Sequence, residues 1–221
     1  MLMDITLPVT AEMMGTAWEN TAKSLVGHLG THFDVMDKEF PLEYTQRDGI
    51  VFDVSHIRER DIGLSDIDHS RIQPGMFVAF CTDFMTQVKY GTAEYFKTHP
   101  QLSRELVALL LERKVSVIGI DCGGIRRGSE HVPIDQKCAD QGVFVIENLY
   151  GLKALLAAGD RFTARTFPLR YAGITGIPCR VADDPESCVA YGCGKSLAWI
   201  NHMTEGPINI ARQRMMKSNQ Y

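Results

Sequence analysis

The stretch from His28 to Asp34, HLGTHFD, places two imidazoles and one carboxylate within seven residues. These are ligand types that divalent zinc or manganese prefers. On a helix, His28 and His32 would share a face while Asp34 pointed away. On an extended strand the span is roughly 20 Å, too long for one ion. A chain that folds back at Gly30 meets the requirement, because glycine tolerates a tight reversal. We therefore predict a strand end that runs into a metal-binding loop.

The string H-x-G-T-H-x-D resembles the signature of the cyclase-like metal hydrolases, the family that includes bacterial kynurenine formamidase. The resemblance covers about residues 1–183 and continues through Gly119–Asp121 to the triplet Glu147-Asn148-Leu149. It implies a swivelling β/β/α fold, C–N bond hydrolysis, and metal ligation by the 28–34 loop. It also implies that Glu147 is a ligand. The alternatives are that the histidines are ordinary polar residues near a turn and that Glu147 caps a following helix.

Several positions depart from the family pattern. Lys38 stands where the family has a histidine for acid/base work, and Asp135 stands where it has a ligand histidine, twelve residues before the glutamate. The loop that usually offers serine and aspartate has Gly124 and Arg126 instead. An aspartate can bind zinc or manganese, so the sequence is compatible with one or two ions. His131, one helical turn before Asp135, is an alternative ligand, although we interpret it as a loop histidine.

Lys38 and Asp135 suggest a coupled replacement for the two missing histidines. We expect the Lys38 ammonium to lie against Asp135 and Glu147, where opposite charges hold each other ionised. The site would then hold one metal, and Lys38 would be the catalytic residue that orients substrate or exchanges a proton. The alternative is that Lys38 is a solvated loop residue and Asp135 opens a helix.

Alternating strands and helices must position these groups. Hydrophobic patterns predict strands at residues 4–8, 49–54, 76–82, 115–121, 143–147, 162–171 and 178–181. They predict helices within 90–99 and at about 103–114, 134–141 and 149–158. Because strand-rich segments lie at both ends, we expect a mixed α/β sheet rather than a doubly wound one. Residues 1–183 would form the hydrolase domain. We expect residues 184–221 to pack on that domain or on a neighbouring subunit.

Composition narrows the class of protein. The chain has 221 residues, of which 45% are hydrophobic and 23% charged, and its net charge is −4. No basic run suggests nucleic-acid binding, and no apolar stretch approaches a membrane span. The first residues lack the pattern of a signal peptide. The six cysteines form no C-x-x-C pair, which favours reduced thiols in a cytoplasmic protein. Cys122, at the end of a strand, is a candidate nucleophile, but a buried structural thiol is the preferred interpretation.

Together these features predict a metal-dependent hydrolase of a small amide, formamide or lactone. His28, His32 and Asp34 would hold the divalent ion, with Glu147 and Asp135 completing the site. We expect a small-molecule substrate and a homo-oligomer, with no nucleic-acid or membrane partner. The alternative is a non-catalytic metal or small-ligand binding protein that kept the metal-binding residues and lost the chemistry.

Overall fold

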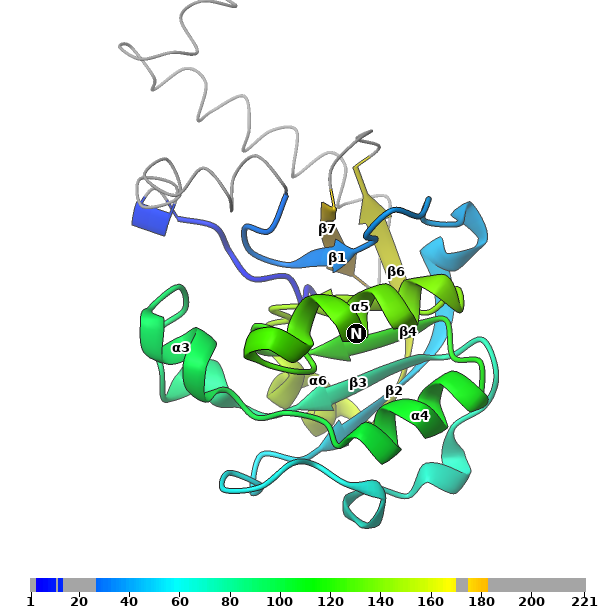
Figure 1. Cartoon of the computed structure of the whole chain (residues 1–221), viewed down its shortest axis with the longest axis horizontal. Coiled ribbons are helices and arrows are strands. Elements are labelled where there is room, and N and C mark those ends of the chain that lie inside the picture. Colours follow the sequence, from blue (N-terminus) through cyan, green and yellow to red (C-terminus); the bar gives the residue numbers. More distant parts are fainter. Residues whose placement is uncertain (1–2, 11, 14–26, 170–174, 183–221) are drawn as a thin grey trace, which may run out of the picture. The chain divides into compact units, whose positions relative to one another are not determined.

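Seven strands form one closed sheet in the computed structural model, which describes residues 3–10, 12–13, 27–169 and 175–182 (Figure 1). The order around the barrel is β1-β5-β4-β3-β2-β6-β7. The strands are β1 (His32–Asp34), β2 (Gln46–Asp53), β3 (Phe77–Cys81), β4 (Val117–Ile120), β5 (Phe144–Glu147), β6 (Arg161–Pro168) and β7 (Gly176–Ala182). Strands β2 to β5 run parallel, whereas β1, β6 and β7 pair antiparallel with their neighbours. The predicted mixed α/β class is therefore confirmed.

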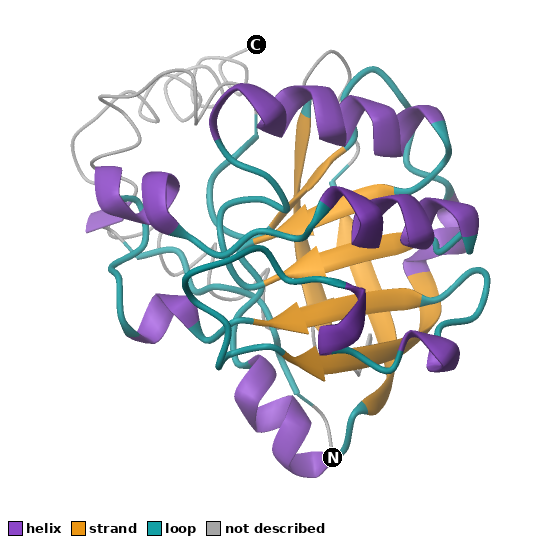
Figure 2. Cartoon of the chain, turned by 60° about the horizontal axis from the view of Figure 1, so that its bottom comes forward, coloured by secondary structure: helices purple, strands orange, loops and turns teal. Residues whose placement is uncertain are grey.

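Helices connect the parallel strands and lie against the sheet (Figure 2). The α-helices are α3 (Ala93–Thr98), α4 (Arg104–Glu112), α5 (His131–Asp140) and α6 (Leu152–Ala158). Short 3₁₀ helices occupy η1 (Leu42–Thr45), η2 (Leu64–Asp66), η3 (His69–Arg71), η4 (Phe84–Thr86) and η5 (Gly128–Glu130). Helix α4 begins as predicted, because the Ser103 hydroxyl accepts a hydrogen bond from the Leu106 amide at 3.1 Å. In the part of the chain that is described, no helix is long and apolar enough to span a membrane.

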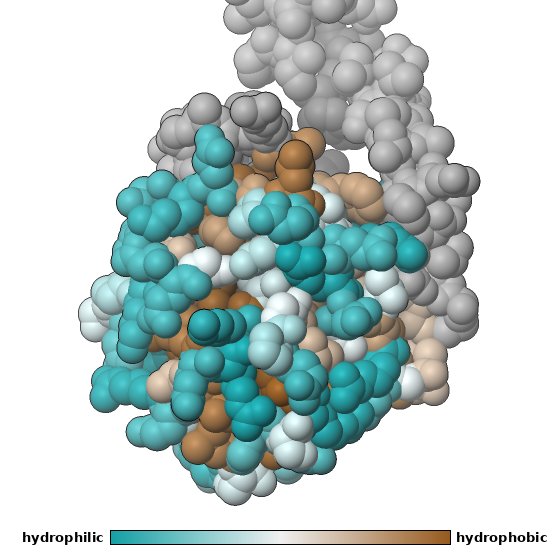
Figure 3. Space-filling model, turned by 90° about the vertical axis from the view of Figure 1, so that its right-hand side faces the viewer, coloured by the Kyte–Doolittle hydropathy of each residue, from teal (hydrophilic) through white to brown (hydrophobic). Residues whose placement is uncertain are grey.

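Two apolar clusters form the core, one on each side of the sheet. In β2, Ile50 and Phe52 join the cluster under α3 and α4, whereas Val51 joins the other. The same alternation separates Val78 from Phe77 in β3. This is the period of two that a pleated strand imposes. The second cluster takes a residue from every strand, as the interior of a closed barrel requires. The surface shown in Figure 3 is largely hydrophilic, with hydrophobic patches between the polar side chains.

Several predicted elements differ from the structure, among them the helix predicted at 149–158, which begins at Leu152. Residues 4–8 form isolated bridges at Asp4 and Thr6, the second of them with Leu149, in place of a full strand. The metal loop runs into strand β1, so His32 and Asp34 lie on a strand that follows the loop, while the strand end predicted before it lies outside the described residues. Helix α5 begins at His131, three residues before the predicted start, because a 3₁₀ turn at η5 leads directly into it. The predicted extension at 184–221 lies outside the described residues.

Candidate metal centre

The three predicted ligands of the first motif converge on one point. The Nε2 atom of His28 lies 3.2 Å from Asp34 Oδ1, and the Nε2 atom of His32 lies 3.5 Å from the same oxygen. His32 and Asp34 are buried, while the His28 side chain is 32% exposed. Two imidazole nitrogens and a carboxylate oxygen are thus directed at a common position, as a metal ion requires.

Gly30 makes this convergence possible. Its φ is +71°, and a Cβ atom there would lie 2.7 Å from a methyl of Val9. Only glycine suits both the left-handed dihedral and the close approach. The predicted reversal at this residue is therefore present. It brings His28 back over the strand that carries His32 and Asp34.

Glu147 reaches the centre through strand pairing. Strands β1 and β5 are antiparallel, and their register sets His32 opposite Glu147. The His32 Nε2 atom lies 3.6 Å from Glu147 Oε2. The position of Glu147 at the end of β5 thus places it beside the first motif, although 115 residues separate the two in sequence.

A second group of donors shares Asp34 with the first. It consists of Asp34, His131, Asp135 and Glu147, whose ligand atoms all lie within 4.8 Å of one another. His131 Nε2 is 3.5 Å from Asp135 Oδ2 and 3.6 Å from Glu147 Oε1. Asp135 comes from the buried face of α5, four residues after His131. The helical spacing that brings the two together was visible in the sequence, but the expected helix began too late to include His131.

Buried carboxylate oxygens without partners indicate that a cation belongs here. Among the described residues, Asp34 Oδ2, Asp135 Oδ1 and Glu147 Oε1 are buried and accept no hydrogen bond. Such groups are costly unless a charge or a metal satisfies them. Burial and the charge of Asp34 raise the pKa of Asp135 and of Glu147 well above their usual range. Burial also acts on Asp34, but the neighbouring histidines His32 and His28 hold the pKa of its carboxyl below the ordinary value. The donor set therefore fits one or two divalent ions.

Hydrogen bonds behind the ligands fix their orientation. His32 Nδ1 lies 2.9 Å from the Gly30 carbonyl, so that an Nδ1–H donor leaves the Nε2 lone pair facing the carboxylates. The same carbonyl accepts a bond from the Asn148 side chain at 3.0 Å. Asn148 in turn accepts a bond from the buried Tyr95 hydroxyl at 2.7 Å. The Asn148 carbonyl also accepts a bond from the Thr31 hydroxyl, also at 2.7 Å. In the Glu147-Asn148-Leu149 triplet, Glu147 is thus a candidate ligand, and Asn148 supports the loop of the first motif.

Lys38 does not join this cluster. Its Nζ atom forms ion pairs with Asp140 Oδ1 at 2.8 Å and with Asp37 Oδ1 at 3.1 Å, and its side chain is 36% exposed. The expected contacts with Asp135 and Glu147 are replaced by this surface pairing. Asp140 is the last residue of α5, and its exposed carboxylate pairs with the ammonium at the surface. A catalytic role for Lys38 stays a prediction.

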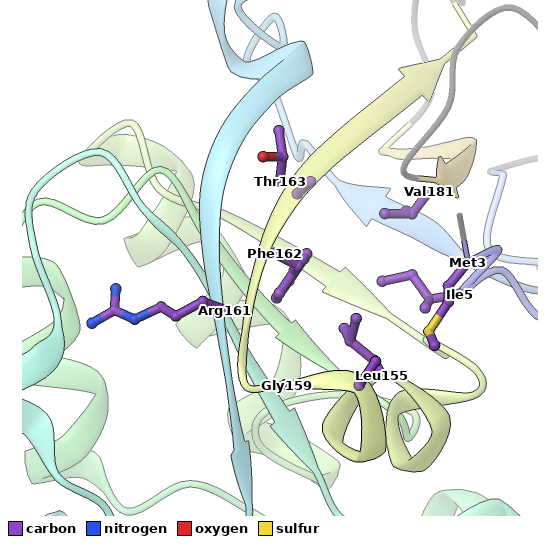
Figure 4. A pocket seen from close by; sticks show the side chains of 10 residues that line it. Met3, Ile5, Leu155, Gly159, Arg161, Phe162, Thr163 and Val181 are labelled. Carbon is purple, nitrogen blue, oxygen red and sulfur yellow. The ribbon is translucent and has the colours of Figure 1, made fainter. Parts of the chain in front are cut away.

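Two other features contribute no atom to the donor groups. Cys122 is buried, with Sγ 3.5 Å from His99 Nδ1, and burial raises the pKa of its thiol, which agrees with a structural role. The four described cysteines are free. A cavity of about 280 Å³ is lined by apolar side chains that include Ile5, Leu155 and Phe162, while Arg161 points away from them (Figure 4). Its lining includes no residue of the donor groups.

The structure is a closed mixed α/β barrel whose clustered imidazoles and buried carboxylates could hold a metal ion. The chain belongs to the Cyclase family, whose model matches residues 3–126, more than half of the sequence. That match includes the His28–Asp34 motif and ends before α5. No curated protein matches the chain.

Solved structures share the fold. One is a potential metal-dependent hydrolase with cyclase activity, 23% identical, with a TM-score of 0.62 over 84% of this chain and 98% of that one. A second is a predicted metal-dependent hydrolase from Bacillus stearothermophilus, 22% identical, with a TM-score of 0.60 over 82% and 97%. A third is isatin hydrolase A from Labrenzia aggregata bound to benzyl benzoate, 22% identical, with a TM-score of 0.58 over 69% and 71%. These likenesses establish the architecture.

Proposed function

We propose that this protein is a metal-dependent hydrolase that cleaves a small amide, formamide or lactone. The observation that carries the proposal is the pair of donor groups that share Asp34, with buried carboxylate oxygens that accept no hydrogen bond. A divalent ion bound there would polarise a carbonyl group and lower the pKa of water. The names of the structural relatives, metal-dependent hydrolases and isatin hydrolases, support this reaction class.

The chain's own residues supply a rigid, preorganised frame for this chemistry. His32 is held by Gly30, Gly30 by Asn148, and Asn148 by Tyr95, all within the core. His28 remains partly exposed, so the first donor group opens toward solvent at that side chain. A small substrate would therefore approach the centre from the side of His28, while Asp34, Asp135 and Glu147 stay buried behind it.

The test compares metal-loaded with chelated protein on formanilide, isatin and a small lactone. Isatin is included because it is a cyclic amide and gives its name to the relatives. We expect hydrolysis of at least one of these compounds only in the loaded protein, and its loss in Asp34→Asn. Equal rates in loaded, chelated and Asp34→Asn protein, or no turnover of any of them at full metal loading, would overturn the proposal.

A binding protein without catalysis is the second candidate, and one observation favours it. The position that carries an acid/base histidine in the resembled family is Lys38, which is paired with Asp140 at the surface. A protein that binds metal in the first donor group yet hydrolyses none of the three compounds would fit this second function. Cytoplasmic location and a homo-oligomeric state stay predictions.

A further inference from the structure

The two donor groups differ in chemistry. The first offers two imidazole nitrogens and one carboxylate oxygen, from His28, His32 and Asp34. The second offers one imidazole nitrogen and three carboxylates, from His131 and the acids Asp34, Asp135 and Glu147. Imidazole suits zinc, whereas carboxylate-rich sites suit harder cations such as manganese. The shared Asp34 places the two groups next to each other.

His131 is held in a ligand orientation by the loop before it. Its Nδ1 atom lies 3.1 Å from the Arg126 carbonyl, so that an Nδ1–H donor leaves Nε2 facing Asp135 and Glu147. The Arg126 side chain is itself buried. Its guanidinium donates to the Leu102 carbonyl at 2.8 Å and to Glu130 at 3.1 Å, and it also pairs with Asp61. The loop that presents the carbonyl is therefore anchored on three sides.

Gly124 provides the space that the imidazole of His131 occupies. A Cβ atom at residue 124 would lie 2.6 Å from His131 Nδ1 and 2.8 Å from its Cε1 atom. The φ of Gly124 is +126°, which side chains other than glycine rarely adopt. A larger residue here would displace the imidazole. The absence of a side chain at Gly124 is therefore what allows the His131 imidazole to occupy this position.

We infer that this chain has two unlike cation sites, and that Gly124, Arg126 and His131 build the second one for a hard ion such as Mn²⁺ while the first takes Zn²⁺. The inference deepens the proposed function, because it assumes that the donor groups bind metal. It assigns His131 as a ligand and Gly124 and Arg126 as positioning residues. Asp135 supplies an additional oxygen from the next turn of α5.

The experiment loads metal-free protein with one equivalent of Zn²⁺ and then titrates Mn²⁺. Free Mn²⁺ is followed by electron paramagnetic resonance, and bound metal is counted by elemental analysis. We expect one Zn²⁺ and one Mn²⁺ per chain. His131→Ala should weaken Mn²⁺ binding by about tenfold or more and leave Zn²⁺ bound. His28→Ala should weaken Zn²⁺ binding and leave Mn²⁺ bound.

Matched glycine variants separate the role of Gly124 from general backbone strain. Gly124→Ala should weaken Mn²⁺ binding as His131→Ala does. Gly128→Ala should not, because Gly128 also has a positive φ but an added Cβ would meet no atom within 4 Å. If Gly124→Ala does not fold, the crossed pattern of His28→Ala and His131→Ala decides the question alone.

Several outcomes would overturn the inference. They are a total of one ion per chain, displacement of the bound Zn²⁺ by Mn²⁺, or unchanged Mn²⁺ affinity in His131→Ala. Each is distinct from failure of the proposed function. A protein that binds both ions but hydrolyses no amide or lactone supports the inference and contradicts the function.

Discussion

His32 and Glu147 are cross-strand partners, and their side chains meet at 3.6 Å where β1 pairs with β5. The backbone register thus sets the geometry of the candidate centre before any side chain is considered. Substitutions at the two residues therefore test the same site. The change at His32 removes an imidazole nitrogen, and the change at Glu147 removes a carboxylate.

His32→Ala should purify with little metal at native folding. The substitution deletes a buried nitrogen donor and leaves Asp34 and Glu147 facing each other without it. Elemental analysis after dialysis measures the content, with His56→Ala, a change at an exposed histidine, as the control. Wild-type metal content in His32→Ala would show that the 28–34 loop is not the site.

Glu147→Gln should lower metal occupancy while leaving the melting temperature of metal-free protein almost unchanged or slightly higher. Burial makes the charged form of Glu147 unfavourable and raises its pKa, and a neutral amide in the metal-free protein avoids that cost. The alternative that Glu147 caps the following helix is wrong, because α6 has Gly151 at its N-cap. A loss of about 1 kcal/mol of stability in Glu147→Gln with metal content intact would instead show a purely structural role for Glu147. Calorimetry and metal counting on the same sample distinguish the two.

Lys38→Ala should leave metal content unchanged and reduce turnover by less than about tenfold, because its ammonium is occupied by Asp140 at the surface. A general acid or base typically contributes 10²- to 10⁴-fold. The matched control is Asp140→Asn, which breaks the same ion pair from its other side. A loss of about a hundredfold in Lys38→Ala alone would establish Lys38 as the catalytic residue.

Stability should fall in acid through His99. Burial first, and then the charges of Arg127 and His131, lower the pKa of His99 to about 4, against 6.5 for the unfolded chain. The unfolded state therefore binds the proton at higher pH, and the free energy of unfolding falls as pH drops from about 6.5 toward about 4. The slope from this one group is at most about 1.4 kcal/mol per pH unit.

Urea unfolding of wild type and His99→Asn at pH 7.5 and pH 5 measures this contribution. The wild type should lose more stability than the variant between the two pH values. His56→Asn, an exposed-histidine control, should follow the wild type. Parallel losses in wild type and His99→Asn would refute the assignment to His99.

The sequence predicted the fold class and the strands well because the buried strands are continuous apolar runs. Examples are Phe77–Cys81 and Val117–Ile120. It also predicted the reversal at Gly30, because the ligand spacing allowed no regular element. It could not show where Lys38 lies, since the partner that attracts it, Asp140, is 102 residues away at the end of α5. His131 was interpreted as a loop histidine because the sequence did not reveal the 3₁₀ turn at η5, and helix α5 was therefore expected to begin after it.

The shortness of β1 has a consequence for how the barrel stays closed. Three residues pair on one side with β5 and on the other with β7, and two of them, His32 and Asp34, are candidate ligands. An ion held between β1, β5 and α5 would stabilise the barrel where its strand pairing is shortest. A ligand that binds only the closed form stabilises that form by mass action. The free energy of opening the β1 pairing, and with it the amide hydrogen exchange rate of Phe33, would therefore depend on metal concentration.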